Sequence, residues 1–127
     1  MKNSELVAAY KNLTALVERN EKYPVRFSYA VTRNLKALEP LINDYHNELN
    51  KLFEAYGEKD GAGEIKKDKD GGVRIAGEHQ EAWERDIREL LEIDVEVTPH
   101  MVCIDALPEN IEPGVLIVLD FMIEAGE

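Results

Sequence analysis

Residues 28–56, SYAVTRNLKALEPLINDYHNELNKLFEAY, decide the fold of this 127-residue chain. Apolar side chains recur along them at alternating intervals of four and three residues, which is the a and d spacing of a heptad repeat. This spacing predicts one long helix with a continuous apolar stripe. Pro40 falls on the outward side, where it bends the helix without entering the stripe. The stripe consists of Val31, Leu35, Leu38, Ile42, Tyr45, Leu49, Leu52 and Tyr56.

A shorter helix is predicted before the long one. Its apolar residues recur at helical spacing, and Ser4 is suited to cap its first turn. Those residues are Leu6, Tyr10, Leu13 and Val17, and Ala9 and Leu16 widen the apolar face. A turn follows, because Pro24 pushes the preceding residue out of the helical region. We expect the two helices to form a long antiparallel, coiled-coil-like hairpin over residues 1–57.

The two predicted helices differ in length. At about 1.5 Å per residue the first covers about 24 Å and the second about 44 Å, so half of the stripe stays uncovered. Either the C-terminal half of the chain or a second chain must cover it. The expected partners are a host protein or a second copy in a homo-oligomer. The uncovered residues, a stripe for intramolecular packing or for oligomerisation, are Tyr45, Leu49, Leu52 and Tyr56.

After the long helix the sequence predicts short elements. Gly57 is expected to end that helix with a positive φ. Residues 64–75 predict an exposed β-hairpin around an Asp-Gly-Gly turn, and residues 93–105 predict one bent strand or two short ones. Helices are predicted over residues 78–92 and from Pro113 to about residue 124.

The fold class that follows is α+β and mainly helical. The helical hairpin is followed by a small antiparallel β-sheet and two shorter helices. A chain of this length fits one domain, residues 1–127, with the hairpin over 1–57 and an acidic α/β portion over 58–127.

The net charge of −11 is unevenly distributed. Residues 77–127 contain 14 acidic side chains against Arg85 and Arg88, whereas residues 19–36 are net basic. A field this negative disfavours binding to duplex nucleic acid, whose affinity comes from neutralising phosphates. The layout allows a solvated acidic surface or pairing between basic and acidic ends of neighbouring copies.

The inventory of reactive side chains is thin, and the sequence predicts no enzyme, no cofactor and no metal site. None of the usual hydrolase, phosphate-binding or zinc-protease motifs is present. Cys103 lies in an apolar run, where an inert buried thiol is expected. His100 and Cys103 lie three residues apart in a predicted strand, so they point to opposite faces and cannot share a metal ion.

One group of side chains is a candidate binding site. Basic residues and tyrosines recur on the side of the long helix opposite the stripe and at the bend before it. Bidentate arginines and a stacking tyrosine suit an anionic ligand such as a phosphate-bearing small molecule, or an acidic protein surface. A solvated helix face is the simpler alternative. The candidate residues are Lys22, Tyr23, Arg26, Tyr29, Arg33 and Lys36.

Four short blocks, taken in order and spacing, are similar to a known family. They are Tyr29-x-Val31-x-x-Asn34-x-x-x-Leu38, Tyr56-Gly57-Glu58-Lys59-Asp60, ELLEIDVEV at 89–97 and LDFMIE at 119–124. Together the blocks resemble an uncharacterised family of small bacteriophage and prophage proteins, a domain of unknown function. The family has no assigned activity, so the resemblance implies no catalytic residue. Gly61-Ala62-Gly63 and the tail at 125–127 depart from the family pattern.

The resemblance implies a small phage-type binding protein rather than an enzyme. We expect a protein–protein interaction module or an inhibitor of a host defence factor, of the anti-CRISPR or anti-defence kind. A virion or assembly component and a binder that sequesters an anionic nucleotide-like molecule are the alternatives. The longest apolar run, Val115 to Leu119, is too short to span a bilayer and no secretory signal is visible, so a cytoplasmic protein in the bacterial host is expected.

Overall fold

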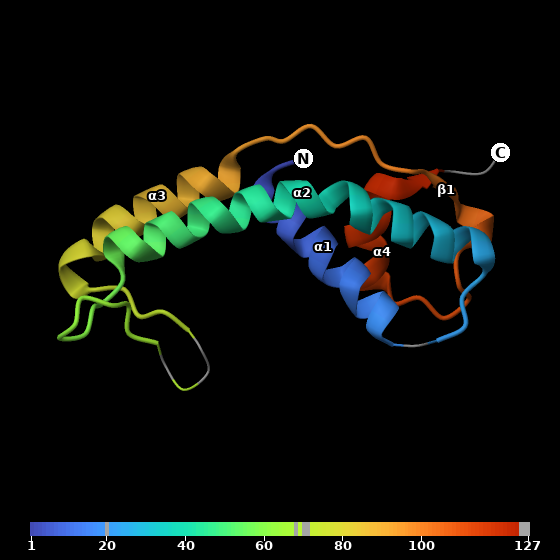
Figure 1. Cartoon of the computed structure of the whole chain (residues 1–127). Coiled ribbons are helices and arrows are strands. Elements are labelled where there is room, and N and C mark those ends of the chain that lie inside the picture. The colour runs from blue at the N-terminus through green and yellow to red at the C-terminus, as the bar shows by residue number, and fades with distance from the viewer. Residues whose placement is uncertain (20, 68, 70–71, 125–127) are drawn as a thin grey trace. The chain divides into compact units, whose positions relative to one another are not determined.

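The computed structural model describes residues 1–19, 21–67, 69 and 72–124. In chain order its elements are α1 (Asn3–Glu18), α2 (Val25–Tyr56), the 3-10 turn Gly77–His79, α3 (Gln80–Glu92), β1 (Val102–Cys103), the 3-10 turn Ile104–Ala106, α4 (Pro113–Leu119), the 3-10 turn Asp120–Met122 and β2 (Ile123–Glu124) (Figure 1). The chain is mainly helical with one two-stranded sheet, so the predicted α+β class holds at this level.

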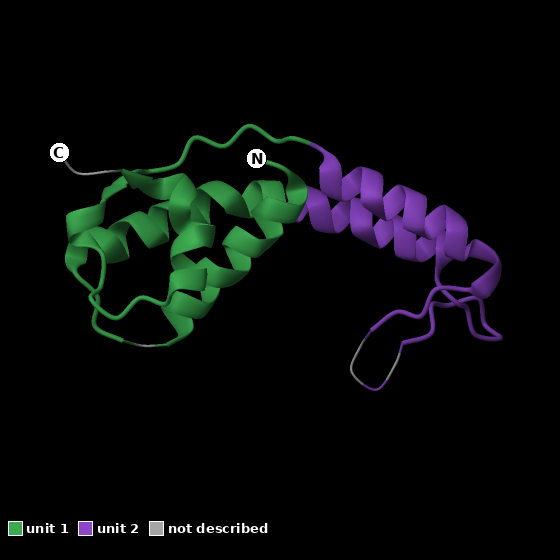
Figure 2. Cartoon of the chain, turned by 180° about the vertical axis from the view of Figure 1, so that it is seen from behind, with its two compact units in different colours: residues 1–42, 94–127 green, residues 43–93 purple. Residues whose placement is uncertain are grey.

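The chain divides into two compact units, which Figure 2 colours separately. Unit 1 contains residues 1–42 and 94–127, and unit 2 contains residues 43–93. Helix α2 contributes residues to both units. The single domain expected from chain length stays a prediction.

Helix α1 packs one face into the core of unit 1. Its buried side chains lie at intervals of three, four and three residues, as an amphipathic helix requires. They are Leu6, Ala9, Leu13 and Leu16. Val17 was expected on this face, but its side chain is 55% exposed. The buried face is centred between the Leu6–Leu13 and Ala9–Leu16 rows, and Val17 lies at its edge. The predicted cap at Ser4 is also wrong: the helix begins at Asn3, and the backbone N–H of Lys2 donates to Glu5 Oε1 at 3.0 Å.

The antiparallel hairpin of α1 and α2 is not confirmed. Figure 1 shows α1 crossing α2 obliquely, and the backbone of α1 runs close to α4. Val115 and Leu119 of α4 share the buried core with α1 and with the first part of α2. Helix α4 thus covers apolar side chains of α1 and α2 that would contact only each other in a two-helix hairpin.

Helix α2 begins at Val25, three residues earlier than residue 28, where the sequence predicted its start. Pro24 lies directly before it, and the Pro24 carbonyl accepts the N–H of Ser28 at 3.0 Å, which closes the first turn. The helix continues through the exposed Pro40, as the outward position predicted. It buries Phe27 and Leu38 completely in unit 1.

The predicted antiparallel sheet is wrong. Strands β1 and β2 pair in parallel, with Val102 opposite Ile123 and Cys103 opposite Glu124. The connection from β1 to β2 contains α4 and acts as a crossover, which returns the chain in its original direction. The closing helix was predicted to continue to about Glu124, but α4 ends at Leu119. The residues after it form a 3-10 turn and then β2.

The described residues between 57 and 76 form isolated antiparallel bridges rather than continuous strands. Gly57 pairs with Ile75, Lys59 with Ile65 and Lys67 with Val73. Residues 68, 70 and 71 of the predicted Asp-Gly-Gly turn lie outside the described residues. Of the strand or strands predicted over 93–105, only β1 and a bridge between Asp94 and Lys2 are formed.

Gly57 ends the long helix, but not by the predicted positive φ, which among the described glycines only Gly63 adopts. Its N–H donates to the carbonyl of Phe53 at 2.8 Å. A Cβ at Gly57 would lie 2.6 Å from the same carbonyl oxygen. The position therefore requires glycine because the backbone approaches closely, not because of a left-handed conformation.

In unit 2, α3 lies alongside the second part of α2 (Figures 1 and 2). The rings of Phe53 and Trp83 stack with centroids 5.2 Å apart and an angle of 17° between their planes. The hydroxyl of Tyr56 donates to Asp86 Oδ2 at 2.6 Å. Within the described residues, no helix is both long and apolar enough to cross a membrane.

Candidate binding sites

The candidate stripe on α2 is a solvent-facing row of side chains. Arg26, Tyr29, Arg33 and Lys36 follow one another at intervals of three, four and three residues, and all four are exposed. Within the part of the chain that the structure describes, none of the three cations has an ion-pair partner. We call these four residues the α2 basic face.

Tyr29 is the centre of the α2 basic face. Its side chain is 56% exposed, and its ring packs edge-on against the ring of His100, with centroids 5.2 Å apart. One helical turn earlier Val25 is 83% exposed, and Met101, which follows His100, is 40% exposed. The basic face therefore borders apolar surface, a combination of aromatic, methionine and arginine side chains that is enriched at protein interfaces.

His100 is held in place by a buried asparagine that the sequence analysis did not single out. Asn34 is 1% exposed, and its amide makes two hydrogen bonds with the backbone of His100. A signal was present in the sequence, because Asn34 lies three residues after Val31 and four before Leu38, on the apolar side of the helix. A polar residue at such a position needs a partner.

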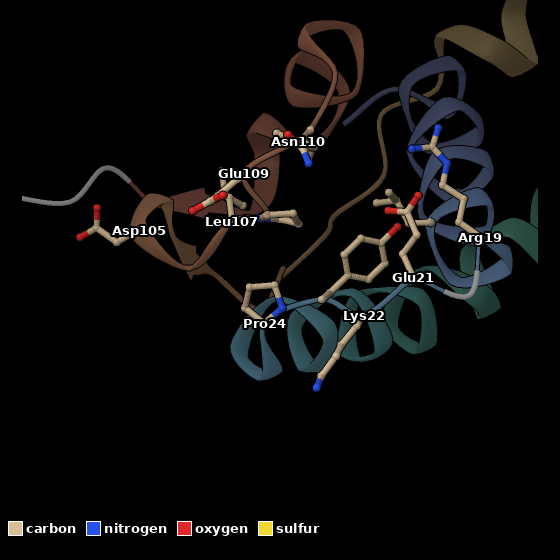
Figure 3. A pocket seen from close by; sticks show the side chains of 12 residues that line it. Arg19, Glu21, Lys22, Pro24, Asp105, Leu107, Glu109 and Asn110 are labelled. Atoms are coloured by element: carbon tan, nitrogen blue, oxygen red, sulfur yellow. The ribbon is translucent and has the colours of Figure 1, made fainter.

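The structure separates Lys22 and Tyr23 from the α2 basic face. Both precede the helix and line a cavity of about 510 Å³ between the turn after α1 and residues 105–111 (Figure 3). The Lys22 side chain points away from the other labelled side chains. The Tyr23 ring packs edge-on against Phe27, with centroids 5.5 Å apart.

Within the described residues, the buried oxygen of the Tyr23 hydroxyl has no partner at hydrogen-bonding geometry. Burial raises the pKa of this hydroxyl, and the nearby negative charge of Glu21 raises it further. The hydroxyl therefore stays protonated in the neutral range and keeps both a donor and an acceptor available.

The packing stripe Tyr45, Leu49, Leu52 and Tyr56 lies in unit 2, where α3 runs alongside it. Tyr45 is buried and the other three are half-buried. Burial raises the pKa of Tyr45, and the hydrogen bond to Asp86 raises the pKa of Tyr56. Tyr56 contacts α3 through Asp86, and the use of this stripe in oligomerisation stays a prediction.

Cys103 is the single cysteine of the sequence and lies outside these sites. Cys103 is half-buried, and its sulfur lies 3.8 Å from Asp105 Oδ2. Across residues 1–19, 21–67, 69 and 72–124, no three His, Cys, Asp or Glu side chains gather as a metal site.

Comparisons of this chain with family models, with curated proteins and with solved structures found no match. The resemblance to the phage family therefore stays a prediction.

Proposed function

We propose that this protein is a non-enzymatic protein-binding module and that the α2 basic face, Arg26, Tyr29, Arg33 and Lys36, is its docking surface. The observation that carries the proposal is that three exposed cations, without ion-pair partners among the described residues, share one helix face with an exposed tyrosine on a chain of net charge −11. Such a surface is complementary to an acidic patch with an apolar centre on the partner.

Shape and charge favour a protein partner over the alternatives. The outer face of a helix is convex, whereas sites for small molecules are concave, which makes a nucleotide-like ligand a poorer fit. The net negative charge of the whole chain opposes binding to duplex DNA or RNA. Val25 and Met101 add exposed apolar area beside Tyr29, which suits the centre of a protein interface.

The family resemblance extends the proposal to the class of partner. A small phage protein that acts in the cytoplasm of its host would dock on a host protein, and an acidic docking patch on a defence factor is the target that we propose. A role in the virion or its assembly is the alternative, and it predicts large self-assembly.

The test compares two double variants. Arg26→Glu with Arg33→Glu reverses two charges on the α2 basic face, and Lys11→Glu with Lys59→Glu makes the same change of charge at exposed positions outside it. Proteins captured from host lysate by the wild type are identified, and the binding of each purified partner is then measured by calorimetry. We expect the first variant to bind at least about tenfold more weakly and the second to bind like the wild type.

Two results would overturn the proposal. Equal binding of a partner by both double variants would show that the α2 basic face is not the docking surface. Native mass spectrometry that finds large assemblies, or a nucleotide released on denaturation, would favour one of the two alternatives.

A further inference from the structure

The cavity beside Tyr23 has the chemistry of a second site, separate from the α2 basic face. Its volume of about 510 Å³ falls within the range of small-molecule sites. Leu16, Leu107 and Ile111 contribute apolar wall. The cavity thus combines aliphatic surface with polar groups at its edges.

Among the described residues, the hydroxyl of Tyr23 is a buried polar group of this cavity that lacks a hydrogen-bond partner. A buried hydroxyl without a hydrogen bond costs free energy, and such groups are rare in folded proteins. Glu21 and Tyr23 both line the cavity, and after burial the negative charge of Glu21 is the next contribution that raises the pKa of Tyr23, so the Glu21 carboxylate lies near the hydroxyl. Glu21 is exposed, so rotation of its side chain would uncover the hydroxyl to a ligand.

The charges of the lining favour a cation. Glu21, Asp105 and Glu109 contribute three carboxylates, against Arg19 and Lys22. Lys22 and Asp105 both point away from the other labelled side chains, which leaves Glu21 and Glu109 as the carboxylates and Arg19 as the cation of the lining (Figure 3). An anion placed at the Tyr23 hydroxyl would be repelled by the negative charge of Glu21.

We propose that this cavity binds a small organic cation, a primary amine or guanidinium carried on an aliphatic chain. Once the Glu21 side chain has rotated, the ligand N–H donates to the Tyr23 hydroxyl oxygen, and the Glu21 carboxylate pairs with the ligand cation. The aliphatic chain of the ligand lies against Leu16 and Leu107. The carboxylate of Glu109, on the opposite side in Figure 3, attracts a second positive charge at the far end of a diamine.

The test measures binding of defined probes to the full chain by calorimetry. Agmatine and cadaverine are the cationic probes, glutarate is an anion of similar length, and 1-pentanol is the neutral control. We expect agmatine or cadaverine to bind and glutarate and pentanol not to bind. Tighter binding of glutarate than of either amine, or no heat from any amine up to millimolar concentration, would overturn the proposal.

Three variants locate the bound cation. Tyr23→Phe removes the hydroxyl and keeps the ring, and Glu21→Gln removes the neighbouring charge; each should weaken amine binding about tenfold. Glu39→Gln removes one charge at an exposed position of α2 outside the cavity and should leave binding unchanged. An equal loss in Glu21→Gln and Glu39→Gln with no loss in Tyr23→Phe would mean that the amine is attracted only by the overall negative charge, and unchanged binding in all three variants would likewise refute the site.

Tyr23→Phe also has an effect that does not depend on ligand. Because the hydroxyl is unpartnered in the free protein, the variant should unfold at the same or a higher temperature than the wild type. Lower stability of the variant without ligand would show that the hydroxyl is already satisfied, which contradicts the premise of the site.

A second set of probes distinguishes the two natural sources of such a cation. Capped arginine and capped lysine, with blocked amino and carboxyl groups, represent basic side chains of another protein. If they bind as well as agmatine and cadaverine, the cavity accepts a side chain of a partner. If only the free amines bind, the ligand is a free metabolite.

Discussion

The side chain of Asn34 and the backbone of His100 are joined by two hydrogen bonds. Asn34 Nδ2 donates to the His100 carbonyl oxygen at 2.9 Å, and the His100 N–H donates to Asn34 Oδ1 at 2.7 Å. The Asn34 amide therefore pairs with an extended segment of chain as a neighbouring strand would. It fixes the segment before β1 on α2 and places the ring of His100 against Tyr29.

Asn34→Ala should destabilise the protein by about 2–3 kcal/mol, because it leaves the N–H and the carbonyl of His100 without their partners. Chemical denaturation followed by circular dichroism measures this change. Asn47→Ala, at an exposed position of the same helix, is the matched control and should change stability by less than about 0.5 kcal/mol. An Asn34→Ala variant as stable as the control would contradict the role given to the pair.

Gly57→Ala should destabilise the end of α2 by about 1–3 kcal/mol, since the new Cβ would lie 2.6 Å from the Phe53 carbonyl oxygen. Gly61→Ala is the control, because nothing lies within 4 Å of a Cβ at that position. Thermal unfolding of the two variants should separate them clearly. Equal melting temperatures would show that the backbone at Gly57 relaxes without cost.

The hydrogen bond between Tyr56 and Asp86 should give stability a pH dependence at both extremes. That bond, followed by the hydrogen bond from Arg85, lowers the pKa of Asp86. Ionised Asp86 therefore contributes to folding stability above the unfolded pKa of about 3.9, and this contribution is lost as pH falls through the lower folded pKa. The bond raises the pKa of Tyr56, so that contribution is present below about 10 and is lost as pH rises through the folded pKa.

Tyr56→Phe tests this dependence directly. The difference in stability between wild type and variant should be largest between about pH 5 and pH 9 and should shrink toward both extremes. Tyr10→Phe, which keeps the Tyr56 hydroxyl, should show the pH dependence of the wild type. A difference between wild type and Tyr56→Phe that stays constant from pH 2 to pH 11 would argue against the bond.

Leu49→Asp places a charge on the half-buried face of α2 and should destabilise unit 2 by about 2–3 kcal/mol. Trp83, the single tryptophan, stacks on Phe53 in the same unit, so its emission should shift to longer wavelength when that unit loosens. Asn50→Asp introduces the same charge at the next, exposed position and should leave emission unchanged. An unaltered Leu49→Asp variant would refute the heptad stripe as a packing surface.

The sequence predicted those features that depend on local periodicity. The heptad spacing located α2 and its buried side, and Pro113 located the start of α4, because both signals act within a few residues. The pairing of β1 with β2 was out of reach, since two-residue strands carry almost no pattern and their direction depends on the path of the chain between them.

The candidate site was predictable in part, for a similar reason. Arg26, Tyr29, Arg33 and Lys36 share a face because they lie on one helix, whose geometry follows from sequence spacing. Helical spacing says nothing about Tyr23, which precedes the first turn of α2. Its position depends on packing against residues 105–111, a contact between segments distant in sequence.

The discontinuity of unit 1 has a consequence for biosynthesis. Residues 43–93 are continuous and can pack as soon as they leave the ribosome, whereas residues 1–42 must wait for residues 94–127 to complete their shared core. At about 5–20 residues per second, the 34 residues of that second segment add several seconds during which the apolar face of α1 lacks α4. This interval is when a nascent chain would be most exposed to chaperones, proteases and aggregation.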